Sequence, residues 1–347
     1  MTSRRRELGF LSFVPNPYGP DHAARALDDG LRLFEHAEQL GFDIGWIRSR
    51  HFEEYPSSPL TFLAAASQRT RRIRLGTGVI PMRYEDPIRL AEDAATVDLL
   101  SGGRLELGVS SGIPQFAPIL DPVFGVSGRG FANEAQHRLG RLRTALAGTA
   151  VARSGNGFMS IPSDTDLAVT PRAAGLANRV WYGPGTLAGA TRTGEQGLNI
   201  QVSTLNSEET GASFAGGQAA QLRAYKRSFA RATAGSGRTP RLAAGRIILP
   251  FCDPRDADAY AEFIHGYNAR MQADGRPYTS SVPMRFDRVH SGEPARIVDG
   301  LLADEALNEV TEITVTLPSP GGLDAHLRTL DAVAAHIAPA LGWTPAA

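Results

Sequence analysis

Short apolar runs alternate with segments of helical periodicity along most of this chain. The first run covers residues 7–14. Beyond it, apolar side chains recur three or four residues apart, at Leu27, Leu31, Phe34, Ala37 and Leu40. Asp21 can cap the start of this predicted helix, and Gly41 can end it. The pattern therefore predicts a strand followed by an amphipathic helix.

The same alternation continues through the rest of the sequence. It predicts strands at residues 7–14, 42–48, 73–80, 105–109, 179–182, 198–202, 241–249 and 312–317. The helices between them are predicted to begin near residues 21, 57 and 86, and then to span 131–147, 186–196, 218–232, 254–271, 294–303 and 323–340. Parallel strands need long crossovers, which helices supply. Eight such units favour an α/β fold, a single (β/α)8 TIM barrel over residues 1–347, over an open doubly wound sheet.

Two polar stretches account for the length that a plain barrel does not need. Residues 148–178 are rich in Gly, Ser, Pro and Asp, which predicts an inserted loop or a small hairpin. Residues 274–293 are also polar and contain Gly275 and Pro277. This second insertion has two interpretations, a lid over the barrel or an exposed loop without a mechanistic role.

The composition restricts the functions open to such a barrel. Among 347 residues, 36 Lys and Arg balance 36 Asp and Glu, so the formal net charge is zero. A nucleic-acid-binding domain or a polybasic membrane-surface protein carries a basic excess. No uninterrupted apolar run reaches the roughly 18 residues that a membrane span needs. We therefore expect a cytoplasmic protein with a small-molecule substrate, no nucleic-acid partner and no membrane contact.

The sequence contains no recognisable metal-binding pattern. Its eight histidines form neither H-x-H nor H-E-x-x-H, so we expect no catalytic metal. Cys252 is the only cysteine, which excludes an intrachain disulfide and a cysteine-based zinc site. We expect Cys252 to be a small buried side chain.

The clearest candidate ligand site is the segment 182–189, where a short strand runs into glycines and then into a helix. A helix start favours an anion, because its first N–H groups and its dipole attract negative charge. Gly183, Gly185 and Gly189 would let a phosphate approach, and Thr186 could donate its hydroxyl. The alternative is a tight turn, which needs glycine without any ligand.

A nicotinamide dinucleotide is the weaker candidate for this loop. The spacing is G-x-G-x-x-x-G, which only approximates the dinucleotide fingerprint. The acid expected at the end of the following strand is absent, because Ser-Thr-Leu-Asn occupies residues 203–206. A G-x-x-x-x-G-K-[ST] phosphate loop is also absent.

A second candidate site follows the second predicted strand, in the series Arg-Ser-Arg-His-Phe-Glu-Glu over residues 48–54. His51 can transfer protons near neutral pH. Glu53 or Glu54 could orient it or tune its charge. The alternative is a histidine at the rim that packs under a loop.

Five stretches in the first third of the chain carry a family resemblance. They are His51–Tyr55, Leu75–Pro81, Asp86–Asp93, Asp98–Leu105 and Leu107–Val109. In this order they resemble the bacterial luciferase-like monooxygenase family, flavin-dependent enzymes on a (β/α)8 barrel. The likeness continues more weakly through residues 179–202 to the last predicted strand.

The resemblance implies a reduced flavin bound across the carboxyl ends of the strands. In the family, a peptide after the third strand is often cis and packs beneath the flavin ring; here it is Gly78–Val79. The phosphate would lie at Gly185, Thr186 and Gly189. The catalytic histidine would come from the loop after the second strand.

The sequence departs from the family pattern at two positions. Bacterial luciferase has two adjacent histidines before the phenylalanine, and its catalytic one falls on Arg50, while the second falls on His51. Arg50 cannot act as a base at neutral pH, but could stabilise a peroxide or a substrate anion. The arginine that helps to hold phosphate falls on Ser111, which follows Ser110 after the fourth strand. These departures weaken light emission more than flavin binding.

The resemblance thus implies a monooxygenase that uses reduced FMN and dioxygen on a small organic substrate. Because the nicotinamide signature is weak, a separate flavin reductase is the expected source of reduced FMN. A homodimer is expected from the resemblance alone. The alternatives are a deazaflavin-dependent oxidoreductase on the same fold and a flavin-binding protein without catalysis. Aromatic residues near strand ends could line an apolar pocket or belong to the core: Phe10, Phe13, Trp46, Phe52 and Phe116.

Overall fold

The apolar runs of the chain form one closed parallel barrel in the computed structural model, which describes residues 5–53, 55–126, 128–207, 213–279 and 283–346. Around the barrel the strand order is β3-β2-β1-β15-β11-β9-β8-β5, and a pairing between β3 and β5 closes it. The barrel strands are β1 (Glu7–Ser12), β2 (Ile44–Ile47), β3 (Arg74–Thr77), β4 (Ile80–Pro81), β5 (Leu105–Ser110), β8 (Val180–Tyr182), β9 (Asn199–Val202), β11 (Leu242–Arg246) and β15 (Glu312–Thr316). The (β/α)8 barrel predicted from the sequence is confirmed.

Two predicted strands are divided in the structure. The third separates into β3 and the short β4, both of which pair with β5, and the Gly78–Val79 peptide between them is cis. The seventh separates into β11 within the barrel and β12 (Ile248–Pro250) outside it. The barrel therefore keeps eight positions, with β3 and β4 sharing one of them.

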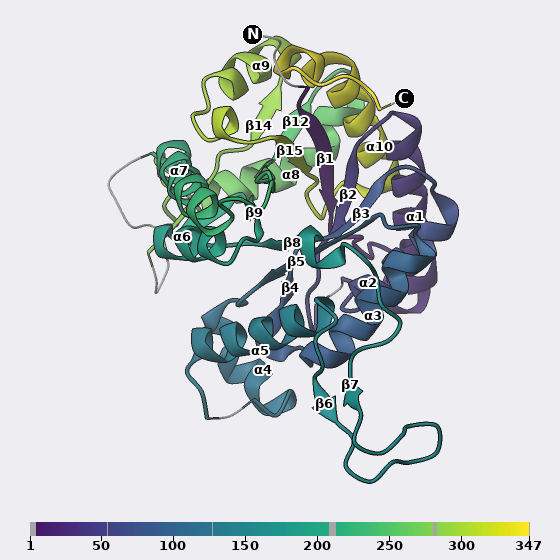
Figure 1. The fold of residues 1–347 in the computed structure, drawn as a ribbon. Coiled ribbons are helices and arrows are strands. Elements are labelled where there is room, and N and C mark those ends of the chain that lie inside the picture. The colour runs from purple at the N-terminus through teal and green to yellow at the C-terminus, as the bar shows by residue number, and fades with distance from the viewer. Residues whose placement is uncertain (1–4, 54, 127, 208–212, 280–282, 347) are drawn as a thin grey trace.

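Helices cover the outside of the barrel (Figure 1). In chain order they are α1 (Ala23–Gln39), α2 (Pro59–Arg69), α3 (Pro87–Leu100), α4 (Ala117–Val123), α5 (Phe131–Leu146), α6 (Leu187–Glu195), α7 (Phe214–Ala232), α8 (Pro254–Ala269), α9 (Pro294–Leu302) and α10 (Gly322–Ala332). Asp86 caps α3 by accepting the N–H groups of Ile88 and Arg89. The predicted cap of the first helix is wrong, because Asp21 lies in a short 3-10 turn and α1 begins two residues later.

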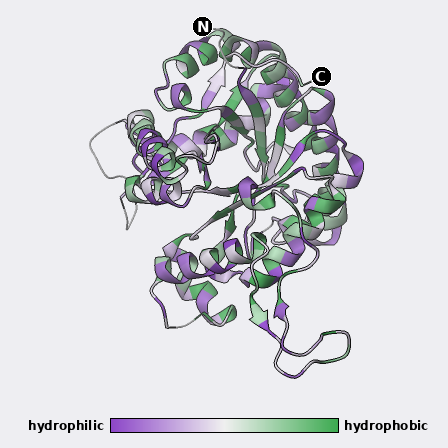
Figure 2. Ribbon diagram, in the orientation of Figure 1, coloured by the Kyte–Doolittle hydropathy of each residue, from purple (hydrophilic) through white to green (hydrophobic). Residues whose placement is uncertain are grey.

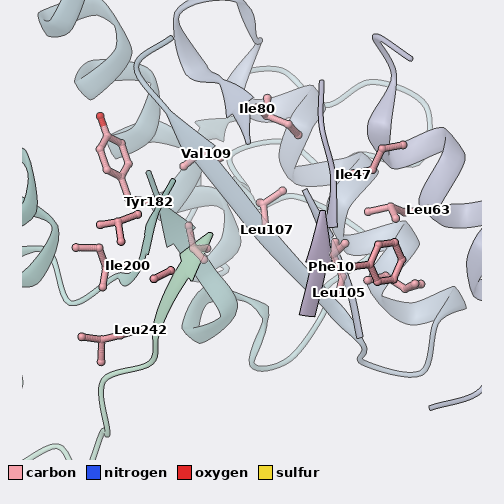
Figure 3. Packing of buried hydrophobic residues seen from close by; sticks show 14 of the residues in the cluster. Phe10, Ile47, Leu63, Ile80, Leu105, Leu107, Val109, Tyr182, Ile200 and Leu242 are labelled. Atoms are coloured by element: carbon pink, nitrogen blue, oxygen red, sulfur yellow. The ribbon is translucent and has the colours of Figure 1, made fainter. Parts of the chain in front are cut away.

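The main hydrophobic core lies between the strands and the helices, and Figure 3 shows part of it. Phe10 of β1 packs against Phe34 of α1 with ring centroids 4.9 Å apart. Leu105, Leu107 and Val109 of β5 alternate along one strand and all belong to this cluster. Figure 2 shows hydrophobic residues concentrated in the strands and hydrophilic residues on the outer helix surfaces. Burial of this apolar surface is the main force that holds the helices to the barrel.

The two polar stretches both contain short strands, and the first forms the small hairpin that was one of the two predicted alternatives. Residues 148–178 include the small antiparallel hairpin β6 (Ala152–Arg153) and β7 (Asp166–Leu167), which projects from the barrel (Figure 1). Residues 274–293 contain β13 (Met284–Phe286) and β14 (His290–Gly292), which pair with β10 (Leu205–Ser207) and β12. The described part of this second insertion is therefore attached to its neighbours rather than loosely exposed, while its role as a lid stays a prediction.

The interior of the barrel is filled by two tryptophans. Trp46 and Trp181 are fully buried and meet edge to face, with ring centroids 5.4 Å apart. A Cβ atom on Gly76 would lie 2.1 Å from the Trp46 ring, so only glycine leaves room for this indole. Each indole N–H donates to a buried carboxylate, Trp46 to Glu312 at 2.8 Å and Trp181 to Glu106 at 2.7 Å.

Arginines accompany these interior carboxylates. Arg74 and Arg241 both bind Glu106, with N–O distances of 3.1 and 2.7 Å. Glu312 has no such direct partner, and its Oε2 is buried without a hydrogen bond among the described residues. Burial raises the pKa of Glu106 and that of Glu312 to about 7. In the unfolded chain these carboxyl groups have a pKa near 4.5, whereas in the folded protein it is about 7. Between these two pH values the folded protein retains protons that the unfolded chain has released.

We predict that the melting temperature falls as the pH rises from about 4.5 to about 7, because over this interval the unfolded chain has released the Glu312 proton while the folded protein still retains it. Glu312→Gln stays neutral and should lose part of this fall. Each unit of pKa displacement corresponds to about 1.4 kcal/mol of stability. Glu92→Gln, at an exposed helix position paired with Arg89, is the matched control and should leave the pH dependence unchanged. Equal pH dependence in wild type and Glu312→Gln would contradict the assignment.

Candidate functional site

The predicted cofactor residues meet at the carboxyl ends of β3, β5 and β8. The backbone N–H of Gly183 donates to the carbonyl of Val109 at 2.9 Å, which continues the β5–β8 pairing and sets Ser110 beside Gly183. A Cβ atom on Gly183 would lie 3.5 Å from Cγ1 of Val79, so the Gly78–Val79 peptide borders the same place. The fold thus brings together four residues that are up to 105 positions apart in the chain.

The loop after β8 has the geometry of a capped helix start. Thr186 is the N-cap of α6, and its Oγ1 accepts the N–H of Gly189 at 3.0 Å. Among the described residues the hydroxyl of Thr186 donates to no acceptor, so its hydrogen can be donated to an anion. A Cβ atom on Gly189 would lie 3.0 Å from this Oγ1 and would crowd it. The carbonyl of Gly185 accepts the N–H of Ser207, which attaches the loop to β10.

The two serines after β5 have different partners. The Oγ of Ser110 accepts the N–H of Gly112 at 3.1 Å. The Oγ of Ser111 lies 2.7 Å from the hydroxyl of Tyr182, which also accepts a hydrogen bond from Gln136 at 3.1 Å. Tyr182 and Gln136 therefore position Ser111, a link that only the tertiary structure reveals because these residues come from three separate elements.

His51 lies in an aromatic environment at the barrel rim. Its ring is 4.7 Å from that of Phe124 and 6.5 Å from that of Tyr84, measured between centroids. Its Nε2 is buried and has no hydrogen-bond partner among the described residues. This burial lowers the pKa of His51 below its ordinary value of 6.5. The imidazole is therefore neutral at pH 7 and able to accept a proton.

Arg50 forms an ion pair with Glu53, the acid that the sequence suggested as a partner of His51. Its guanidinium pairs with Glu53 at 2.9 Å and lies over the ring of Phe116, 5.6 Å from the centroid. The Nε of Arg50 is buried without a hydrogen-bond partner in the described part of the chain. Glu54, the other acid proposed to orient His51, lies outside the described residues. In the structure, then, Glu53 pairs with Arg50 rather than with His51.

The segment 113–126 covers this side of the rim and was not predicted as a helix. It contains α4, whose Asp121 binds Arg83 through two hydrogen bonds of 2.8 and 2.6 Å. Arg83 also donates to the carbonyl of Phe131 at 3.2 Å. The helix escaped the sequence analysis because it is short and contains Pro122, while Ile119 and Val123 are exposed.

The aromatic residues near strand ends were predicted either to line a pocket or to belong to the core. Phe10 and Trp46 belong to the core, because both are fully buried. Cys252 is exposed rather than buried, since it directly precedes the capped start of α8 and its N–H donates to Asp256 at 3.1 Å. Phe13, Phe52 and Phe116 do reach the barrel rim, and Phe52 is 70% exposed.

Among the described residues, no group of three or more His, Cys, Asp or Glu side chains is arranged to hold a metal ion. No helix in these ranges is long and apolar enough to cross a membrane.

A parallel (β/α)8 barrel with a glycine-rich, capped helix start at its mouth defines a broad class of enzymes that bind phosphorylated cofactors. A family model described as luciferase-like monooxygenase matches residues 7–311. The chain therefore belongs to the luciferase-like monooxygenase family, and the resemblance found in the sequence is confirmed.

Curated relatives match part of the chain. 4-Hydroxyprotoasukamycin monooxygenase from Streptomyces nodosus subsp. asukaensis is 42% identical over 105 residues, which are 30% of this chain and 28% of that protein. Limonene 1,2-monooxygenase from Rhodococcus erythropolis is 36% identical over 115 residues, 32% of this chain and 30% of that protein. These alignments span less than a third of the length of each relative.

Solved structures match nearly the whole chain at low identity. The oxygenating constituent of 3,6-diketocamphane monooxygenase from Pseudomonas putida, in complex with FMN, has a TM-score of 0.71 at 14% identity, with coverage of 96% of this chain and 98% of that one. The coenzyme F420 dependent tetrahydromethanopterin reductase from Methanopyrus kandleri has a TM-score of 0.67 at 18% identity, with coverage of 97% and 99%. These likenesses establish the shared barrel.

We predict that Arg83→Met loosens the segment 113–126, because it removes the charged hydrogen bonds to Asp121. Hydrogen bonds to charged groups contribute about 1.5–3 kcal/mol each, so amide hydrogen exchange in this segment should accelerate. Arg89→Met removes an exposed pair on α3 and is the control, with little expected effect. Unchanged exchange in Arg83→Met would show that the ion pair does not hold α4.

We also predict that the His51 imidazole titrates with a midpoint below 6.5 in the ligand-free protein, because burial disfavours its charged form. The measurement is a proton NMR titration of the histidine rings, with the His51 signal assigned by its loss in His51→Gln. A midpoint at or above 6.5 would contradict the buried environment described above.

Proposed function

We propose that this protein is a flavin-dependent monooxygenase that uses reduced FMN and dioxygen to oxygenate a small organic substrate. Membership of the luciferase-like family supports the reaction class. The observation that carries the cofactor assignment is the convergence of the Thr186 cap, the glycines around it and the Gly78–Val79 peptide at one side of the barrel mouth. A phosphate and a flat ring attached to it require such a helix start beside a surface without bulky side chains.

The residues at this mouth fit a phosphorylated flavin. A Cβ atom on Gly183 would lie 3.5 Å from Cγ1 of Val79, which is an ordinary contact distance. Glycine therefore leaves open a space that a side chain would fill. In this proposal Thr186 donates to the phosphate, with Gly185 and Gly189 allowing close approach. Ser110, Ser111, Gly78 and Val79 border the ring. When bound, the reduced flavin supplies the electrons that activate dioxygen.

His51 and Arg50 are the proposed groups for the chemistry at the opposite edge of the site. His51, neutral because it is buried, can accept a proton from the substrate at pH 7. Arg50 keeps its positive charge and can stabilise negative charge that develops during oxygenation. The aromatic side chains around His51 exclude water from this edge.

The reduced flavin would come from a separate reductase. A relative described as the oxygenase component of a flavin-dependent trigonelline monooxygenase, from Acinetobacter baylyi, provides the precedent for such a division. The acid that a dinucleotide-binding site places at the end of the following strand is also absent at residues 203–206, so the nicotinamide signature of this chain is weak.

The second candidate function is hydride transfer with F420, a deazaflavin. It is favoured by an F420-dependent glucose-6-phosphate dehydrogenase from Amycolatopsis mediterranei among the relatives, 34% identical over 116 residues. Titrating the protein with FMN and separately with F420, followed by cofactor fluorescence and melting temperature, separates the two functions. Tight F420 binding without FMN binding would replace the monooxygenase proposal.

We predict that Thr186→Ala weakens FMN binding about ten-fold or more, because it removes a hydrogen bond to a charged phosphate. Riboflavin lacks this phosphate, so its affinity should stay the same. Thr191→Ala, one turn further along α6 and exposed, is the matched control, together with Cys252→Ser. Unchanged FMN affinity in Thr186→Ala would remove the phosphate assignment.

A further inference from the structure

Arg48 extends the inward-facing series of β2 above the barrel interior. Ile44 and Trp46 point into the barrel, and Arg48 follows at the same alternation. Its backbone N–H donates to the carbonyl of Ser12 at 2.9 Å, so the pairing of β2 with β1 continues to this residue. The guanidinium of Arg48 lies over the ring of Phe13, 5.5 Å from the centroid. Arg48 therefore belongs to the wall of the barrel mouth.

This arginine differs from the other arginines that the fold shields from solvent. Five of those bind a carboxylate directly: Arg74, Arg83, Arg179, Arg241 and Arg246. The guanidinium of Arg48 makes no hydrogen bond or ion pair among the described residues. Its nearest acid in the same loop, Glu53, is already paired with Arg50. Burial and the charge of Arg50 lower the pKa of Arg48 to about 10, yet it remains charged at pH 7.

Aromatic groups surround this unpaired charge. The ring of Phe13 lies 5.4 Å from that of Tyr55, between centroids. The hydroxyl of Tyr55 donates to the Oγ of Ser319, which follows β15, at 3.1 Å. The wall formed by the ends of β15, β1 and β2 thus combines one unpaired cation with two aromatic faces. A planar guanidinium binds carboxylates through two parallel hydrogen bonds, and aromatic faces bind an apolar body.

The barrel topology separates this wall from the proposed phosphate site. Counted in either direction around the barrel, β8 is the fourth strand from β1, by way of β2, β3 and β5 or by way of β15, β11 and β9. Phe13, which follows β1, therefore lies across the mouth from the loop after β8, and Arg48, which follows β2, is three strands away from that loop by the shorter way. One phosphate cannot bind at both places, which leaves Arg48 for a different anion.

We propose that Arg48, with Phe13 and Tyr55, binds the carboxylate of the organic substrate, and that the substrate is an organic acid with an aromatic or otherwise apolar body. The assignment of this anion to the substrate rests on the proposed function, in which the cofactor phosphate occupies the loop after β8. The binding of a carboxylate at Arg48 does not depend on it.

The test compares benzoate with benzamide, a neutral molecule of the same shape, by calorimetric titration of the protein with and without FMN. Wild type should bind benzoate about ten-fold more tightly, or more, because a hydrogen-bonded charge pair contributes that much. Arg48→Met should abolish the preference.

The matched control is Arg25→Met, because Arg25 is also stacked on an aromatic ring, 4.2 Å from the centroid of Tyr18, but on the exposed surface of α1. Arg48→Lys keeps the charge without the planar fork and should retain part of the preference, which covers the case in which the methionine variant does not fold.

The outcomes separate this inference from the cofactor proposal. Equal binding of benzoate and benzamide by wild type, or a preference that survives in Arg48→Met, would overturn it. A loss of FMN affinity in Arg48→Met with unchanged riboflavin affinity would overturn it too, since Arg48 would then hold the cofactor phosphate. A carboxylate preference that depends on Arg48 in a protein that binds no FMN would support the anion site and contradict the flavin proposal.

Discussion

The hydrogen bonds from two indole N–H groups to two buried glutamates organise the interior of this barrel. Trp46 and Trp181 occupy the volume beneath the mouth, and Glu312 and Glu106 accept their polar hydrogens. A buried indole without an acceptor would cost about 1–3 kcal/mol, so each tryptophan depends on its carboxylate. The carboxylates depend in turn on nearby arginines and on retained protons. This network fills the barrel interior, and the candidate functional groups lie at the mouth, beyond the carboxyl ends of the strands.

The buried tryptophans also affect which side chains can lie at the mouth. Trp46 fits only because Gly76 leaves space for its ring, and the next inward position on that strand, Gly78, lies directly above. Glycine and serine dominate the side formed by β3, β5 and β8, which suits a flat ring with a phosphate. Phe13, Arg48 and Tyr55 form the opposite side. The two sides therefore differ in chemistry, which fits the separate positions that we propose for a cofactor and a substrate.

Predictions from short stretches of sequence were confirmed where contacts between neighbouring residues determine the structure. Helix starts near residues 86 and 186 were both predicted, and they depend on local hydrogen bonds that cap them at Asp86 and Thr186. The barrel followed from the count of strand–helix units. Short-range reasoning failed at α4, whose position depends on Arg83 from a distant loop, and at Cys252, whose exposure depends on where α8 begins. It also assigned Glu53 to the wrong partner, because His51 and Arg50 are adjacent and only their side-chain directions distinguish them.

The sequence by itself determined the order of strands and helices, the family and the loop that can hold a phosphate, since periodicity, caps and glycine spacing are properties of short stretches. Only the tertiary structure decided which residues share the mouth. Closure of the barrel sets Ser110 beside Gly183 and puts Phe13 across from the loop after β8, because parallel strands far apart in the chain become neighbours or opposites around one ring. The lowered pKa of His51 was likewise decided by packing, as was the side chain of Arg48, which makes no ion pair among the described residues. Burial and the pairing of Glu53 with Arg50 are consequences of the fold, and no pattern within residues 48–54 contains them.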